Sequence, residues 1–300
     1  MTIAMAIAAA VLLWTYLRLR NAARKDGRRL DTARQALAGC EHLLGLLRAL
    51  QQHRGLSSGW LAGERQFEAR MHARRQELER ELKALAASAE AELTQPRPCL
   101  TPHDLSLFRF RWQTLVEELP GLSIEQGIAR HSQMITYVLD WLAALGEARI
   151  ELPMADRVDA DAARNHANRL PLLAEYLGQA RAVGSGVAAR GTCTPVARVR
   201  LMFLASRSES LIKQAMQVAG DREALAAAQA VKTLTDTVRR KLLAERTVAV
   251  GAEAYFATAT EAIDAVFGWI ESCGAGIRRE LDAGGPGEAA DVPERVAGAV

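Results

Sequence analysis

Two short segments of this sequence each place an arginine among small residues and hydroxyl groups, inside otherwise apolar stretches. The first is Arg54-Gly55-Leu56-Ser57-Ser58-Gly59, and the second is Arg181-Ala182-Val183-Gly184-Ser185-Gly186. A small residue beside an arginine lets another helix approach closely, which keeps the guanidinium group out of solvent. The planar guanidinium group is matched in geometry to a planar oxyanion. The repeated pattern therefore predicts an anion site formed by two similar halves of the chain.

Each arginine also has a simpler interpretation, as a solvated side chain on a helix rich in glycine and alanine. A buried guanidinium group needs a carboxylate or a bound anion as its partner. Glu175 precedes Arg181 by six residues and so lies off its helical face, and no acidic residue follows Arg54 before Glu64. An anion from outside the chain is therefore the expected partner of both arginines.

Other polar residues near the two motifs are weaker candidates for the same site. His53 precedes Arg54 and is interpreted as a hydrogen-bond partner or a pH-sensitive neighbour, or else as a structural histidine. The hydroxyl candidates and the late arginine candidate are Ser57, Ser58, Ser185 and Arg246. Arg207 is a further arginine on an apolar-periodic segment, and both it and Arg246 have the alternative of facing solvent.

The sequence lacks the motifs by which most enzymes and metalloproteins are identified. No phosphate-binding loop, dinucleotide-binding glycine pattern, zinc-protease motif or nucleophile elbow occurs. The four cysteines are scattered without metal-ligand spacing, and the net charge of +3 is too small to indicate nucleic-acid binding. We therefore predict a protein that is not an enzyme, with no cofactor, no metal and no nucleic-acid partner.

The amino-terminal segment is apolar and is followed by a basic cluster. Residues 2–17 carry no charged side chain, and the cluster consists of Arg18, Arg20, Arg24, Lys25, Arg28 and Arg29. Basic residues after the apolar run, and none before it, argue against a cleaved signal peptide. We predict a transmembrane anchor over residues 1–18 and a basic juxtamembrane segment over 19–29. The positive-inside bias places the body in the cytoplasm, at the inner membrane, with a periplasmic body as the alternative.

The rest of the chain has the composition and apolar spacing of an all-α protein. Alanine, leucine and arginine recur at helical spacing, and aromatic residues make up only 5%. The pattern predicts about eight helices, over residues 30–59, 64–92, 102–118, 124–145, 161–190, 196–218, 221–247 and 252–280. Gly55, Gly59 and Pro171 are candidate kink positions. We expect an elongated up-down bundle, or two bundles sharing long helices, followed by a disordered tail over 282–300.

Three segments in order resemble those of the nitrate- and nitrite-sensing (NIT) domain family. Residues 47–59 (LRALQQHRGLSSG) are similar to the signature that opens these domains. Residues 168–182 (NRLPLLAEYLGQARA) and 254–264 (AYFATATEAID) resemble two later segments of related bacterial sensor modules. Together they cover a sensor body over residues 30–281.

The resemblance implies two coaxial, stacked four-helix bundles that hold nitrate or nitrite between arginines of different helices. By position, Arg54 matches the first anion-binding arginine and Arg181 matches the arginine of the second segment. The later arginine of the family corresponds to Arg240 or Arg246. His53 departs from the family pattern, because many members have glutamate at that position.

These observations predict a membrane-anchored sensor that binds a small oxyanion and signals to a partner protein. Since no output domain is recognisable, the signal is expected to pass to a separate partner, and the long helices suit a homodimer. The alternative is a helical scaffold or adaptor in a membrane complex that binds no ligand. An enzyme is the third interpretation, and no nucleophile, base or cofactor loop favours it.

Overall fold

The computed structural model is all-helical over the residues that it describes. These are the backbone of residues 2–217, 220–243 and 248–283, with side chains described from residue 12 onward. No strand occurs within these ranges. The expectation of an all-α fold is therefore confirmed.

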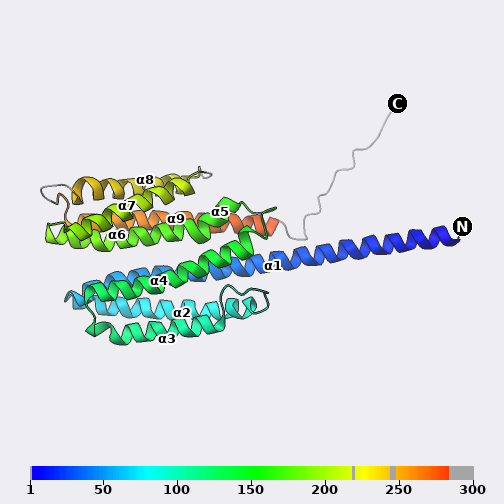
Figure 1. Ribbon diagram of the computed structural model, residues 1–300, viewed down its shortest axis with the longest axis horizontal. Coiled ribbons are helices and arrows are strands. Elements are labelled where there is room, and N and C mark those ends of the chain that lie inside the picture. The colour runs from blue at the N-terminus through cyan, green and yellow to red at the C-terminus, as the bar shows by residue number, and fades with distance from the viewer. Residues whose placement is uncertain (1, 218–219, 244–247, 284–300) are drawn as a thin grey trace, which may run out of the picture.

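The amino-terminal half forms one antiparallel bundle, seen in the lower part of Figure 1. Its helices are α1 (Thr2–Leu61), α2 (Glu68–Glu92), α3 (Pro102–Glu118) and α4 (Ile124–Gly146). The start of α3 follows the predicted cap, because the Thr101 hydroxyl accepts from the Asp104 N–H and the Asp104 carboxylate accepts from the Thr101 N–H. Fully buried leucines of α1 and α2 pack with Trp112 of α3 to form the core.

The carboxy-terminal half forms a second bundle. It contains α5 (Ala160–Arg164), α6 (Leu170–Arg190), α7 (Pro195–Ala215), α8 (Arg222–Thr237) and α9 (Ala252–Ala283). The single helix predicted over 161–190 is interrupted by a π-helical turn, Asn165–Arg169, and Pro171 lies in the first turn of α6. Proline has no N–H to donate to the preceding turn, so Pro171 marks the start of a helix.

Helix α1 is continuous through Gly55 and Gly59, the two candidate kink positions in this segment. Gly59 serves a different purpose, because a Cβ atom at this position would lie 2.4 Å from the Phe67 ring. The chain reverses after α1, and the missing side chain lets Phe67 pack directly on the helix backbone.

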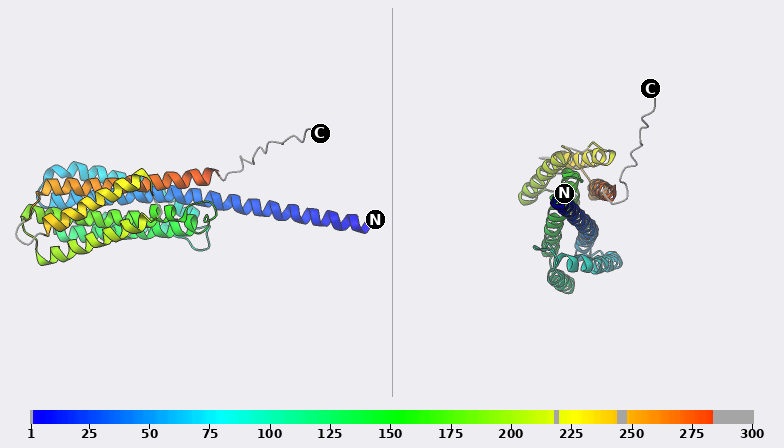
Figure 2. Two further views of the ribbon diagram at one scale, coloured as in Figure 1. Left: turned by 90° about the horizontal axis from the view of Figure 1, so that it is seen from above. Right: turned by 90° about the vertical axis from the view of Figure 1, so that its right-hand side faces the viewer.

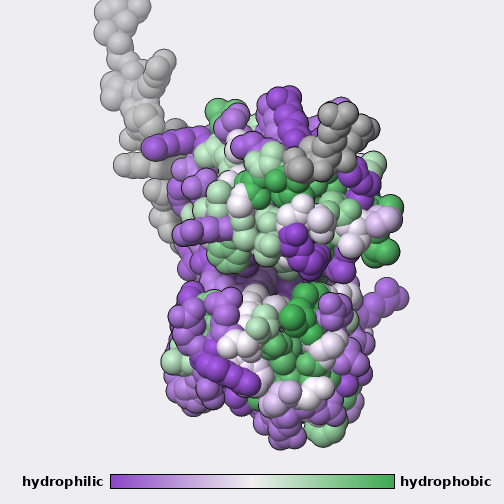
Figure 3. All heavy atoms as spheres, turned by 90° about the vertical axis from the view of Figure 1, so that its left-hand side faces the viewer, coloured by the Kyte–Doolittle hydropathy of each residue, from purple (hydrophilic) through white to green (hydrophobic). Residues whose placement is uncertain are grey.

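The two bundles lie side by side with their long axes roughly parallel (Figures 1 and 2). The coaxial, stacked arrangement expected from the family resemblance is therefore wrong for this chain. Helix α1 contacts α6 and α9 as well as α2 and α4, and ion pairs such as Arg48–Glu271 (3.1 Å) join α1 to α9. Seen from the end opposite the amino terminus, the bundles form two lobes with an indentation between them (Figure 3).

The amino-terminal part of α1 projects beyond both bundles (Figures 1 and 2). Leu12, Leu13 and Trp14 on this part are more than half exposed. Among the described residues, no helix has an apolar stretch long enough to cross a membrane. That finding gives no support to the transmembrane anchor predicted over 1–18, and the side chains of residues 1–11 lie outside the described part. The described part ends with α9 at Ala283, so most of the tail predicted over 282–300 lies outside it.

Candidate functional site

Arg54 is buried at the junction of the two bundles, with only 2% of its surface exposed. Its Nη1 donates to Glu175 Oε1 at 2.6 Å and its Nη2 donates to Glu175 Oε2 at 3.0 Å. Nη1 also donates to the Ser132 hydroxyl at 2.9 Å. The guanidinium group of α1 is thus held by a carboxylate of α6 and a hydroxyl of α4. Paired parallel hydrogen bonds of this kind are among the strongest that arginine makes.

Glu175 is fixed by more than Arg54. Its Oε2 accepts from Gln51 Nε2 at 3.0 Å, and its Oε1 accepts from Gln179 Nε2 at 2.9 Å. The carboxylate therefore receives four hydrogen bonds from three side chains, and the residue is 4% exposed. The expectation that Arg54 has no acidic partner within the chain is wrong, because Glu175 reaches it from the facing bundle.

Arg181 has a different environment. Its Nη1 donates to the Thr260 hydroxyl at 3.1 Å, and its guanidinium carbon lies 4.9 Å from the centroid of the Phe256 ring. Among the described residues, no carboxylate lies within ion-pair distance of Arg181. Burial lowers the pKa of Arg181, and the positive charge of Arg54 lowers it further, whereas Asp264 and Tyr255 act in the opposite direction.

The two arginines approach each other across a close contact between α1 and α6. Arg54 Nη2 lies 3.0 Å from the position that a Cβ atom would occupy on Gly178 of α6. Arg181 Nη2 lies 4.0 Å from the corresponding position on Gly55 of α1. Each guanidinium group therefore lies against a glycine of the opposite helix. The structure brings Arg54 and Arg181 together, as their repeated motifs suggested.

The junction contains two guanidinium groups and one buried carboxylate, and the exposed carboxylate of Asp264 acts on Arg181 without pairing with it, so the buried groups carry an excess of one positive charge. Ser185 lies one helical turn after Arg181, and its buried hydroxyl has no hydrogen-bond partner in the described protein. A hydroxyl at this position is able to donate to an oxygen atom placed beside Arg181. The junction thus combines an unbalanced positive charge with uncommitted donors.

His53 does not join this junction. It is fully buried in the first bundle, in edge contact with the Trp112 ring, and its Nδ1 lies 2.8 Å from His131 Nε2. His131 Nδ1 faces the Gly127 carbonyl, which only accepts, so His131 must donate there and accept from His53. Burial, followed by the neighbouring His131, lowers the pKa of His53 to about 3. His53 is a neutral core residue and not a ligand of the junction.

The other predicted site residues are engaged within their own helix, are exposed, or lie outside the described part. The hydroxyl groups of Ser57 and Ser58 donate to the Arg54 carbonyl at 3.1 and 2.8 Å, so they are engaged within α1. Arg246 lies outside the described residues. Arg240 and Arg207 are exposed, on the π-helical turn after α8 and on α7 respectively.

Several residues of the junction were missed by reasoning from the sequence. They are Glu175, Gln51, Gln179, Ser132 and Thr260. Helical spacing indicates two of them. Gln51 lies three residues before Arg54, and Gln179 lies four residues after Glu175, in each case on the same helical face. No such spacing indicates Ser132 and Thr260, since they come from helices that meet the arginines only in the folded chain.

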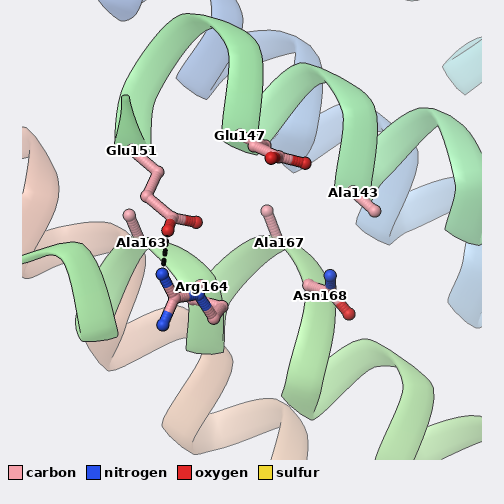
Figure 4. A pocket seen from close by; sticks show the side chains of 7 residues that line it. All are labelled: Ala143, Glu147, Glu151, Ala163, Arg164, Ala167 and Asn168. Carbon is pink, nitrogen blue, oxygen red and sulfur yellow. Dashed lines mark hydrogen bonds and ion pairs between the residues drawn. The ribbon is translucent and has the colours of Figure 1, made fainter. Parts of the chain in front are cut away.

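Two cavities lie elsewhere and suit an oxyanion less well. One of about 160 Å³ is lined by Ala143, Glu147, Glu151, Ala163, Arg164, Ala167 and Asn168, and its arginine is paired with Glu151 (Figure 4). Because it holds two carboxylates and one guanidinium group, its charge is negative. The other, about 390 Å³ between α1 and α9, is lined by apolar residues, by His166 and by two arginines that are each paired with a glutamate.

Comparison with known proteins agrees with the residue patterns and the fold. The sequence model of the NIT family, described as nitrate and nitrite sensing, matches residues 45–275. The solved structure of the NasR transcription antiterminator is similar in fold, with a TM-score of 0.65 and 17% sequence identity. The similarity covers 88% of this chain and 73% of that one. No curated protein matches the sequence.

Proposed function

Because the chain belongs to the NIT family of nitrate- and nitrite-sensing domains, we propose that it binds nitrate or nitrite at the junction of Arg54 and Arg181. It is a sensory helical domain and not an enzyme. The anion contacts both bundles, with Arg181 supplying the unpaired positive charge and the Ser185 hydroxyl an additional donor.

The observation that carries this proposal is the environment of Arg181. Its guanidinium group is partly buried beside a second guanidinium group and has no carboxylate within ion-pair distance among the described residues. Removing a cation from water without a counter-charge is unfavourable. A bound monovalent oxyanion offsets that cost and accepts the hydrogen bonds that Arg181 does not make within the chain.

The position of the junction also supports a way for binding to produce a signal. Arg54 and Ser132 belong to the first bundle, whereas Glu175, Arg181 and Thr260 belong to the second. A ligand that contacts both bundles favours the arrangement in which they lie closest together. We propose that this shift in bundle packing is passed to a partner protein or to a second copy of the chain.

Titration calorimetry with nitrate, nitrite and chloride tests the proposal. We expect heat of binding with nitrate or nitrite in the wild type, and its loss in Arg181→Gln. Arg207→Gln is the matched control, because Arg207 is an exposed arginine on the neighbouring helix α7. Nitrate and nitrite binding of equal strength in Arg181→Gln and the wild type contradicts the proposal.

A helical scaffold without a ligand is the second candidate, and the Arg54–Glu175 pair favours it. A buried ion pair with all its oxygens hydrogen-bonded is able to join the bundles with no anion present. This alternative predicts that neither nitrate nor nitrite produces heat of binding or raises the melting temperature of the full chain.

A further inference from the structure

The three charged groups of the junction have unequal freedom to change partners. Glu175 accepts hydrogen bonds from Arg54, Gln51 and Gln179, so moving it would deprive three buried or partly buried side chains of the acceptor that they share. Arg181, by contrast, donates to one neutral hydroxyl. The Arg54–Glu175 pair is therefore fixed and carries no net charge when an anion arrives. Arg181 is the cation that still lacks a counter-charge.

We propose that Glu175 determines the charge of the anion that the site accepts, by cancelling one of the two arginines so that a single negative charge completes the site. This inference rests on the proposed function. Nitrate and nitrite carry one charge and leave the junction neutral. Sulfate carries two, and its second charge would lie beside the Glu175 carboxylate with no cation to balance it. Glu175 is thus a specificity-determining residue that rejects divalent oxyanions without having to contact the ligand.

The Coulomb energies involved are large enough to produce selection. Like charges a few ångströms apart repel strongly at the effective dielectric constant typical of sites near a protein surface. An unbalanced second charge at the junction therefore weakens binding by well over tenfold. This argument needs no steric difference between a planar and a tetrahedral anion.

Glu175→Gln removes the charge and keeps the size of the side chain. The full chain is titrated with sodium nitrate and sodium sulfate at constant ionic strength, and the ratio of the two dissociation constants is compared with that of the wild type. We expect the ratio to shift toward sulfate by at least about tenfold. Glu92→Gln is the matched control, because Glu92 is also a buried glutamate that accepts two hydrogen bonds from one arginine, Arg149. The control is expected to keep the ratio of the wild type.

A second pair of variants tests the same charge balance without altering Glu175. Thr260→Asp places a carboxylate where the Thr260 hydroxyl meets Arg181, so the chain itself supplies the missing negative charge. Thr260→Asn has a similar shape and no charge. We expect nitrate to bind at least about tenfold more weakly to Thr260→Asp than to Thr260→Asn. This comparison decides the matter if Glu175→Gln does not fold, as judged by circular dichroism.

The outcomes separate this inference from the proposed function. Nitrate binding to the wild type, with an unchanged nitrate-to-sulfate ratio in Glu175→Gln, overturns the role of Glu175 and leaves the sensor intact. Equal nitrate affinities of the two Thr260 variants overturn the charge balance and also the proposed site at Arg181. If neither the wild type nor Glu175→Gln binds nitrate or nitrite, the proposed function itself is wrong.

Discussion

Arg54 on α1 holds Glu175 on α6 through two parallel hydrogen bonds, and this buried pair joins the two helical bundles. Both side chains are at least 95% buried. Their interaction links residues 121 positions apart in the sequence. Arg54 is therefore a structural residue as well as a candidate ligand residue, and its substitution affects stability and binding together.

Substitution of Arg54 is expected to destabilise the fold. In Arg54→Ala the Glu175 carboxylate stays buried without its cation, which costs about 3–5 kcal/mol in the free energy of unfolding. Chemical denaturation measures this change. Arg130→Ala is the control, because Arg130 pairs with Glu118 at the surface, where an ion pair contributes about 0–1 kcal/mol. Equal effects of the two substitutions would show that the buried pair does not stabilise the junction.

Two glycines of the second arginine motif are expected to respond in opposite directions to alanine. A Cβ atom on Gly184 would lie 2.3 Å from two carbons of the Tyr255 ring, whose hydroxyl donates to the Ala180 carbonyl. Gly184→Ala should therefore destabilise the chain by about 1–3 kcal/mol. On Gly186 the nearest atom is the flexible end of Arg190 at 3.4 Å, so Gly186→Ala should stabilise α6 by up to about 1 kcal/mol. Thermal unfolding of both variants checks the difference, and a loss in Gly186→Ala as large as in Gly184→Ala contradicts it.

Stability is expected to fall in mild acid because buried histidines are held neutral. Burial, followed by the nearby His131, lowers the pKa of His53 to about 3, and burial is also the main cause that lowers the pKa of His131 to about 4. Below about pH 6.5 the unfolded chain takes up protons that the folded chain does not, so the free energy of unfolding decreases as the pH falls. The loss continues down to the folded-state pKa values, at up to about 1.4 kcal/mol per pH unit for each histidine.

Denaturation at a series of pH values between 7 and about 4 measures this slope. His131→Gln is expected to reduce it, whereas His103→Gln should leave it unchanged, because His103 is exposed at the start of α3. A free energy of unfolding that is constant over this range would contradict the assignment of His53 and His131 as neutral core residues.

Local features of this chain were predictable from its sequence, and contacts between helices were not. The Thr101 cap and the stripe of leucines on α1 depend on residues three or four positions apart, and both occur in the structure. The side-by-side packing of the bundles brings together pairs such as Arg48 and Glu271, which lie 223 positions apart. No spacing rule within one helix identifies such a pair.

The same distinction applies to the candidate site. The repeated motif predicts the two arginines, whereas the sequence places Glu175 only as a neighbour of Arg181 on its own helix. Its actual partner, Arg54, faces it from the other bundle. His53 adjoins Arg54 in the sequence, which suggests a place in the site, but consecutive helical residues point about 100° apart. Arg54 therefore faces the junction, whereas His53 faces the core of the first bundle.

Membrane attachment through residues 1–18 stays a prediction, and the projecting part of α1 allows a direct test. Leu12 and Leu13 are 69% and 59% exposed, and the Arg18 guanidinium lies 4.2 Å from the centroid of the exposed Trp14 ring. An apolar surface bordered by an aromatic ring and basic residues is typical of a segment at a membrane interface. We expect the full chain to sediment with membranes, and the double substitution Leu12→Glu, Leu13→Glu to release it. Leu152→Glu is the control, because Leu152 is 66% exposed on the helical body and should not affect sedimentation. Recovery of the wild-type chain in the supernatant would show that its exposed apolar surface serves another purpose.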